Sequence, residues 1–171
     1  MMFMKDVRES LQKWAKDPRR FAVVGVGNEL RRDDFVGIRI VQGLRNKVPE
    51  SVMLIESDTI PESYLESIIE FNPSHILLID AGILGLKPGE SKFIESSKAL
   101  GPIRAAISTH VLPLRIFCEH LKKMTSAKIG FLIIQPARTD FGVGLSEDAE
   151  RAASDLEVIL LEIISSPTKG S

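Results

Sequence analysis

A chain of 171 residues is long enough to bury the core of one domain without disulfides or a structural metal. With 44% hydrophobic and 26% charged residues its composition is ordinary for a globular protein, and a net charge of −1 gives no general attraction to nucleic acid or to an anionic membrane. The single cysteine excludes an intramolecular disulfide and a zinc site built from cysteines.

The N-terminal segment, MMFMKDVRESLQKWAKDPRR, has no apolar stretch followed by a cleavage site, so it is not a secretory signal. No part of the chain reaches the ~18 consecutive apolar residues that a transmembrane helix needs. Phe3, Val7, Leu11 and Trp14 recur at helical spacing. We therefore expect a cytoplasmic protein with an amphipathic helix over 1–19, packed on the domain; a helix that docks a partner is the alternative.

After this segment, short apolar runs alternate with helical patterns. Apolar runs bounded by turn residues indicate buried strands. They cover residues 21–27, 52–57, 75–81 and 129–136. The helical patterns cover 34–48, the segment from Thr59 to Asn72, the segment that Pro113 opens, and 146–165, which Ser146 can cap.

Near-continuous apolar strands that alternate with helices predict an α/β fold of three layers, α-β-α. We expect a twisted, mostly parallel sheet of about five strands with helices on both faces. Residues 91–96 alternate in character and predict an antiparallel or edge strand. The whole chain, 1–171, is expected to be one domain, with its core at 20–165 and a flexible tail at 166–171.

Chemistry-bearing residues follow the predicted strands. Asp34 comes after the first strand, Asp80 ends the third, and His110 precedes the helix that Pro113 opens. In open parallel sheets, ligands bind beyond the carboxyl ends of the strands where the strand order reverses. Two carboxylates and one imidazole there suit hydrolysis or a metal such as zinc, nickel or iron.

Each of these residues also has a purely structural interpretation. Asp34 could cap the helix at 34–48, Asp80 could stabilise a turn, and His110 could be a solvated loop residue. Their joint placement at one sheet edge is what favours a functional site.

Other candidates are weaker. His120 lies on a polar helix side, His75 begins a strand at the opposite edge, and Cys118 lies on an apolar helical stripe. Asp58 is expected in a turn, and Gln135 ends its strand where it could contact a substrate backbone. With Cys118 expected in the core, no convincing covalent nucleophile is left, which favours attack by water.

Three motifs together resemble those of the hydrogenase maturation endopeptidases. They are GVGNELRRDD at 25–34 followed by VG, LIDA at 78–81, and STH at 108–110 followed by Pro113-Leu114. They occur in the family's order, and the resemblance covers roughly residues 21–165.

The resemblance implies an endopeptidase that removes the C-terminal extension of a nickel–iron hydrogenase large-subunit precursor after nickel insertion. It implies that Asp34, Asp80 and His110 contact nickel or act at the cut. The nickel would be carried by the substrate, with no tightly bound cofactor of the enzyme's own. We expect a monomer with no nucleic-acid partner and no membrane insertion. Two features depart from the family: Phe35 stands where glycine is usual, and the helix at 1–19 is extra.

Other functions stay open at this point. Gly25 and Gly27 after the first strand imitate a dinucleotide-binding fingerprint, but Leu30 replaces its third glycine, and the acids Asp33 and Asp34 would repel a pyrophosphate. A non-catalytic nickel-sensing or chaperone protein would use the same residues as the protease. An unrelated amidase on a similar fold is a further possibility.

Overall fold

The computed structural model describes residues 2–58, 61–96 and 111–165, apart from the side chains of 2–3, 61–62 and 111–113. Thr59 and the tail at 166–171, for which the sequence predicted a helix cap and flexibility, therefore lie outside the described residues.

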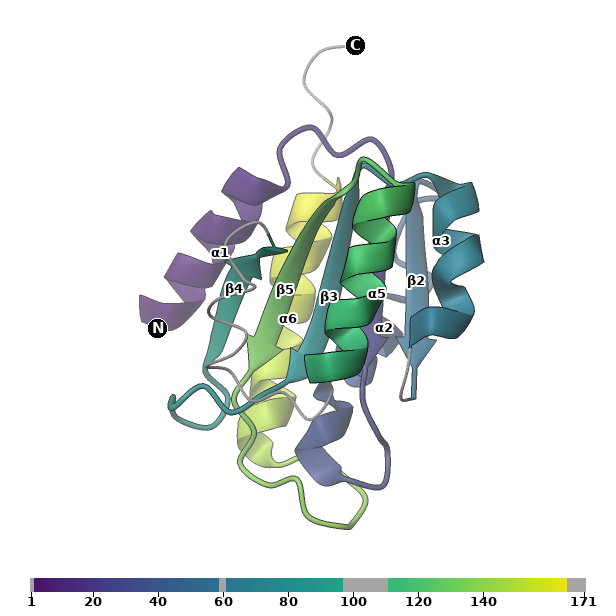
Figure 1. The fold of residues 1–171 in the computed structure, drawn as a ribbon. Coiled ribbons are helices and arrows are strands. Elements are labelled where there is room, and N and C mark those ends of the chain that lie inside the picture. The colour runs from purple at the N-terminus through teal and green to yellow at the C-terminus, as the bar shows by residue number, and fades with distance from the viewer. Residues whose placement is uncertain (1, 59–60, 97–110, 166–171) are drawn as a thin grey trace.

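A five-stranded sheet in the order β2-β1-β3-β5-β4 forms the middle layer (Figure 1). β1, β2, β3 and β5 run parallel, and β4 pairs with β5 in the antiparallel sense, as the alternating pattern predicted. The strands are β1 (Phe21–Val26), β2 (Val52–Ser57), β3 (His75–Ala81), β4 (Ser91–Glu95) and β5 (Lys128–Ile134).

Helices cover both faces of this sheet. One face carries α1 (Met2–Trp14), α2 (Val36–Leu44) and α6 (Glu147–Ser165), and the other carries α3 (Leu65–Phe71) and α5 (Val111–Met124). Short 3-10 helices, η1 (Arg32–Phe35) and η2 (Pro61–Tyr64), precede α2 and α3. The predicted three-layer α/β fold is confirmed.

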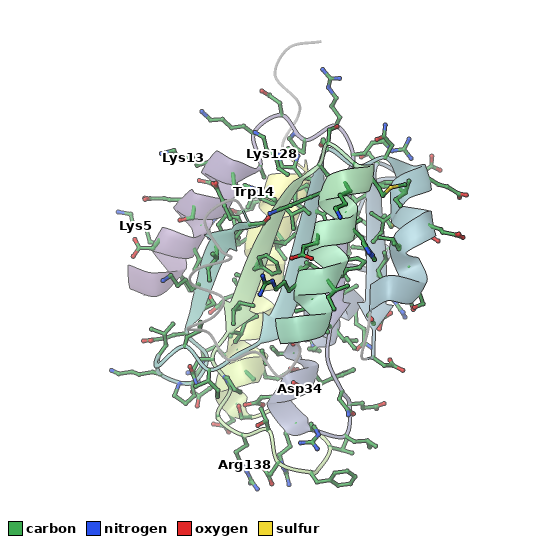
Figure 2. The ribbon with its side chains drawn as sticks, in the orientation of Figure 1. Lys5, Lys13, Trp14, Asp34, Lys128 and Arg138 are labelled. Carbon is green, nitrogen blue, oxygen red and sulfur yellow. The ribbon has the colours of Figure 1, made fainter. Side chains whose placement is uncertain are left out.

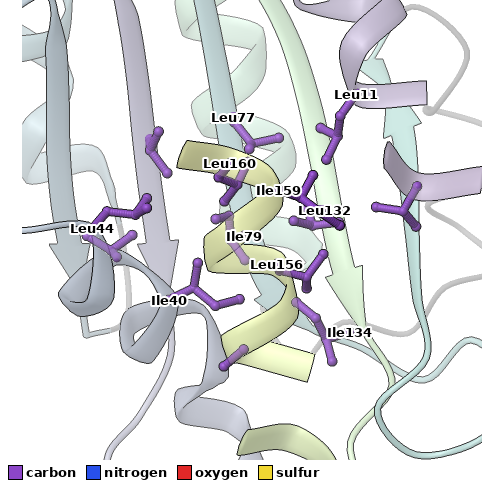
Figure 3. Close-up of a cluster of buried hydrophobic side chains, with 14 of the residues drawn as sticks. Leu11, Ile40, Leu44, Leu77, Ile79, Leu132, Ile134, Leu156, Ile159 and Leu160 are labelled. Carbon is purple, nitrogen blue, oxygen red and sulfur yellow. The ribbon is translucent and has the colours of Figure 1, made fainter. Parts of the chain in front are cut away.

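Two apolar layers hold the helices to the sheet. On one side, Leu156 and Ile159 of α6 pack with Ile79 and Leu132 of the strands (Figure 3). On the other side, α5 buries Phe117 in the second layer. Burying a side chain of this size contributes about 1.5–3 kcal/mol. The strands are apolar on both faces because both faces are covered.

The N-terminal helix packs on the domain, as the helical spacing predicted. Val7, Leu11 and Trp14 are buried, and the Trp14 ring meets Phe21 edge-on at 5.8 Å between centroids. The helix ends at Trp14, earlier than expected. Three residues later Asp17 has a positive φ of 51°, a left-handed conformation that a right-handed helix cannot include.

The helix predicted at 34–48 differs from the observed one. Its first turn is the separate 3-10 helix η1, and α2 begins only at Val36 and ends at Leu44. Arg32, with φ 47°, and Asn46, with φ 63°, both have left-handed backbones that interrupt helical geometry. Ser146 caps α6 as predicted, since the Ala149 N–H donates to its hydroxyl oxygen at 3.2 Å.

Candidate functional site

The strand order reverses between β1 and β3. From β1 the chain crosses through α2 to β2, and from β2 it crosses through α3 to β3 on the other side of β1. Asp34, in η1 after β1, and Asp80, near the end of β3, both belong to the carboxyl edge at this point. In Figure 2, Asp34 lies at this end of the molecule, and Trp14 and Lys128 lie toward the other.

Close backbone contact brings η1 against the ends of β1 and β3. A β-carbon at Gly37 would overlap the carbonyl oxygen of Ile79 and lie 2.8 Å from that of Val26. A β-carbon at Gly27 would overlap the carbonyl oxygen of Asp34. Glycine is needed at both positions because only a residue without a side chain permits this approach. Gly37, in the first turn of α2 and three residues after Asp34, therefore lies directly against the residue before Asp80.

Asp34 and Asp80 are both buried, with exposed fractions of 1% and 0%. Among its interactions, Asp34 accepts a hydrogen bond at Oδ2 from the Asn28 N–H at 3.0 Å. Asp34 is not the cap of α2, because Phe35 occupies that position without a side-chain hydrogen bond. Asp80 accepts a hydrogen bond at Oδ1 from the Ala81 N–H at 2.8 Å, and this contact agrees in part with the prediction that Asp80 stabilises a turn. Buried carboxylates are costly, so their presence favours a function beyond local structure.

Asp33 has a structural role that the sequence did not reveal. Its buried carboxylate accepts hydrogen bonds from the N–H groups of Ala137 (2.8 Å), Arg138 (3.3 Å) and Ser146 (2.7 Å) and from the Ser146 hydroxyl (2.7 Å). These donors all belong to the segment between β5 and α6. Asp33 therefore anchors that segment to η1, next to Asp34.

His110, the third predicted site residue, lies outside the described residues together with Ser108 and Thr109. Helix α5 begins at Val111, at the edge to which the arrowheads of the parallel strands point in Figure 1. Within the described residues no group of three or more His, Cys, Asp and Glu could hold a metal. His110 is not among these residues, so the set Asp34, Asp80 and His110 stays a prediction.

The other two histidines lie away from this edge. His75 is buried at the start of β3, where its Nε2 lies 3.2 Å from the carbonyl oxygen of Trp14. Burial lowers the pKa of His75, an effect that the Trp14 hydrogen bond opposes and the charge of Lys128 reinforces. His120 is exposed on α5. Both placements agree with the sequence interpretation.

Cys118 and Asp58 also lie where the sequence predicted. Cys118 faces the core from α5, and burial raises the pKa of its thiol to about 12. A thiol with this pKa is almost entirely protonated near neutral pH, so it is not a nucleophile. Asp58 is exposed directly after β2.

Gln135 supports a loop of the protein itself. Its side-chain oxygen accepts hydrogen bonds from the N–H groups of Leu84 at 2.7 Å and Leu86 at 3.4 Å. The Gln135 backbone also binds this loop, by accepting from Gly89 at 2.9 Å and donating to Glu90 at 2.8 Å. In the structure Gln135 therefore anchors the loop at 82–90, and its contact to a substrate backbone stays a hypothesis.

The room after β1 that a dinucleotide would need is filled. A pyrophosphate in that fold lies against the glycine-rich turn and the first turn of the helix. Here the backbone of Asp34 already occupies the space beside Gly27.

No helix in the described ranges is long and apolar enough to cross a membrane.

Residues 38–163 match the family model of the hydrogenase maturation proteases. A hydrogenase maturation protease homologue from Methanocaldococcus jannaschii is 34% identical over 166 residues, which cover 92% of this chain and 96% of that protein. The hydrogenase 3 maturation protease of Escherichia coli is 30% identical over 111 residues, 65% of this chain and 69% of that protein.

Solved structures of hydrogenase maturation proteases are also similar to this chain. The crystal structure of the nickel–iron hydrogenase maturation protease HycI from Thermococcus kodakarensis has a TM-score of 0.82 and 30% identity, and the match covers 92% of this chain and 99% of that one. The hydrogenase maturating endopeptidase HybD from Escherichia coli shares the fold, with a TM-score of 0.71 at 24% identity over 82% of this chain and 90% of that one.

Proposed function

The chain belongs to the hydrogenase maturation protease family, and we propose that it removes the C-terminal extension of a nickel–iron hydrogenase large-subunit precursor after nickel insertion. The observation that carries this proposal is the placement of two buried carboxylates, Asp34 and Asp80, at the point where the strand order reverses. Such an edge is where α/β proteins bind their ligands. The enzyme would act in the cytoplasm as a monomer.

In this proposal the nickel is part of the substrate, bound in the precursor. Carboxylate oxygens and an imidazole nitrogen are suitable ligands for such an ion. Asp34, Asp80 and His110 would contact it and hold the precursor so that the bond to be cut lies beside the two carboxylates. The enzyme then needs no tightly bound metal of its own, and only a precursor that already carries nickel is recognised.

Water is the proposed nucleophile. Cys118, the chain's one thiol, is buried in the core with a raised pKa, which supports this choice. Asp34 or Asp80 would take the proton from the attacking water, since either carboxylate can act as a general base. The proton then passes to the amine that leaves when the peptide bond breaks.

The test is to incubate the purified protein with a precursor, with and without nickel, and to identify the products by mass. We expect one cut near the precursor's C-terminus, only in the nickel-loaded form, and no cleavage of casein. Cutting of nickel-free precursor at a comparable rate would reject nickel-dependent recognition. Binding of the loaded precursor without any cut would instead favour the non-catalytic sensing or chaperone function.

A stoichiometric intrinsic metal is the other result that would contradict the proposal. Metal analysis of protein prepared without chelators should find far less than one zinc or nickel ion per chain. A bound zinc whose removal abolished processing would make the protein an ordinary metalloprotease.

A further inference from the structure

Three large apolar side chains are exposed on two loops next to the candidate site. Leu30 follows β1 and is 48% exposed, and Phe141 and Val143 follow β5 and are 74% and 68% exposed. Exposed apolar groups that gather in one place often mark an interaction surface, whereas scattered ones are ordinary. Leu30, Phe141 and Val143 are called the apolar platform below.

Backbone pairing brings the two loops together. The Gly142 N–H donates to the carbonyl oxygen of Leu30 at 2.8 Å, and the Arg32 N–H donates to the carbonyl oxygen of Gly142 at 3.0 Å. Arg31 and Gly142 thus form a short parallel bridge. Because Phe141 and Val143 flank Gly142, this bridge places them beside the turn that carries Leu30.

Gly142 is needed for this arrangement. Its φ of 154° is a backbone conformation that residues with a side chain rarely adopt, so another residue would be strained there. A β-carbon would also lie 2.6 Å from the guanidinium carbon of Arg32, and that side chain would have to move.

The platform is held firmly in the folded protein. Asp33 anchors the segment behind it through four hydrogen bonds, from Ala137, Arg138 and Ser146. Asp140, which precedes Phe141, accepts two hydrogen bonds from Arg138, at 3.0 and 2.8 Å. A surface that is already ordered loses little conformational entropy when it binds, so these exposed side chains are suited to contact a partner.

The platform is continuous with the candidate site. The Leu30 N–H donates to the side-chain oxygen of Asn28 at 2.9 Å, and the Asn28 N–H donates to Asp34 at 3.0 Å. Figure 2 shows Asp34 and Arg138, which lies in the same loop as Phe141, at the same end of the molecule. A protein whose segment reaches Asp34 would therefore lie close to this surface.

Charge adds to the description of the partner. The two loops carry three positive charges, on Arg31, Arg32 and Arg138, and two negative charges, on Glu29 and Asp140. Asp140 forms ion pairs with both Arg32 and Arg138. Arg31 is exposed and forms no ion pair with the residues that the structure describes. A matching surface would be apolar with an acidic side chain opposite Arg31.

We propose that the apolar platform, with Arg31 at its edge, is the surface on which the precursor protein docks, and that it sets the affinity for that substrate. This inference rests on the proposed function, which supplies the partner. A stable protein interface buries about 800 Å² on each partner, and a few large apolar side chains at its centre carry most of the affinity. Phe141, the most exposed of the three, is the strongest candidate for such a centre.

The experiment measures both the affinity for nickel-loaded precursor and the rate of cleavage. Phe141→Ala and Val143→Ala are compared with Val158→Ala, which alters a 54% exposed valine on α6. Replacing exposed side chains should leave thermal unfolding nearly unchanged. We expect Phe141→Ala to weaken binding at least about 10-fold and Val143→Ala by a smaller factor, with kcat within about twofold of the wild type. Val158→Ala should bind as the wild type does, and Arg31→Ala should make binding less sensitive to salt.

The two measurements separate this inference from the proposed function. If the wild type cuts the precursor and Phe141→Ala and Val143→Ala bind it with wild-type affinity, the docking surface is wrong while the protease function stands. If the wild type binds without cutting and both variants lose binding, the docking surface stands and the proteolysis does not. Absence of any binding by the wild type overturns both.

Discussion

Ser146 holds Asp33 through two groups at once. Its hydroxyl donates to Oδ2 and its N–H donates to Oδ1, each at 2.7 Å, while the hydroxyl oxygen also accepts from the first turn of α6. One serine thus caps a helix and fixes the acid that precedes Asp34. The position of Asp34 is in this way tied to a residue that lies 113 positions after Asp33 in the chain.

Asp33→Ala should lower the free energy of unfolding by about 3 kcal/mol, because three backbone N–H groups and the Ser146 hydroxyl lose a charged acceptor. Urea unfolding followed by circular dichroism measures this. Asp58→Ala, which removes an exposed acid at the same sheet edge, should change the free energy by less than about 0.5 kcal/mol. Equal effects of the two substitutions would contradict the anchoring role of Asp33.

Asp34→Asn, Asp80→Asn and His110→Ala should each abolish processing and leave the fold intact. Loss of a general base alone typically slows a reaction about 10²–10⁴-fold, and loss of a contact to the substrate's nickel would add to this. Cleavage of nickel-loaded precursor is measured by mass, with circular dichroism as the check on folding. Asp58→Asn serves as the control and should process normally; a variant at Asp34 or Asp80 with wild-type activity would remove that residue from the site.

Much of this arrangement can be predicted from the sequence because it depends on local patterns. Apolar runs predict the strands to within about two residues, and their alternation with helices predicts the carboxyl edge where Asp34 and Asp80 lie. The roles of Asp33 and Gln135 cannot be obtained in this way. Their partners, Ser146 and Leu84, are distant in sequence and carry no motif that links them.

The same reason explains why the sequence does not predict Phe141 and Val143 as contact residues. In the loop after β3, Ile83 is 49% exposed, whereas Leu84 and Leu86 are half-buried, as is Phe35. The segment after β5 has no visible pattern, and its position next to η1 is revealed only by its contacts with Leu30 and Asp33.

Gly37→Ala should impair both stability and processing. The added methyl group overlaps the Ile79 carbonyl oxygen, and backbone atoms cannot yield as a side chain does. Overpacking of this kind costs about 1–3 kcal/mol, and a displacement of about 1 Å at a reacting group can cost 10²-fold in rate. Urea unfolding measures the loss of stability, and the cleavage assay measures the loss of rate.

Gly43→Ala on the same helix is the matched control. Its methyl group meets the flexible ends of the Glu157 and Arg39 side chains and no backbone atom among its nearest neighbours, and alanine favours the helix over glycine by about 1 kcal/mol. We expect stability within about 1 kcal/mol of the wild type and unchanged processing. If Gly43→Ala impaired processing as much as Gly37→Ala, close contact with β3 would not be the cause.

Cys118→Ala should leave processing unchanged and lower the free energy of unfolding by about 1 kcal/mol, as the loss of a small buried side chain does. Because the pKa of this thiol is raised to about 12, treatment of the folded protein with iodoacetamide at pH 7.5 should also leave the rate of cleavage unchanged. Loss of activity in either experiment, or a trapped acyl-enzyme at any residue, would contradict attack by water.

The stability of the protein should fall in weak acid because of His75. Burial lowers the pKa of His75 in the folded protein below the 6.5 of an ordinary histidine. Between 6.5 and that lower pKa, the unfolded chain binds a proton that the folded protein does not, so stability decreases as the pH falls through this window. The loss is at most about 1.4 kcal/mol for each pH unit, and it stops once the pH is below the folded pKa.

Comparison with His75→Gln isolates this contribution. The glutamine side-chain amide reaches the position of His75 Nε2, 3.2 Å from the Trp14 carbonyl oxygen, and can still donate to that oxygen, but it cannot take up a proton. Urea unfolding of both proteins at pH 7.5 and pH 5.5 measures the change, and the carboxylates common to both cancel in the difference. The wild type should lose more stability than the variant between these two pH values, and both should process precursor equally at pH 7.5, because His75 lies at the edge opposite Asp34. An equal loss in the two proteins would show that His75 does not cause the acid sensitivity.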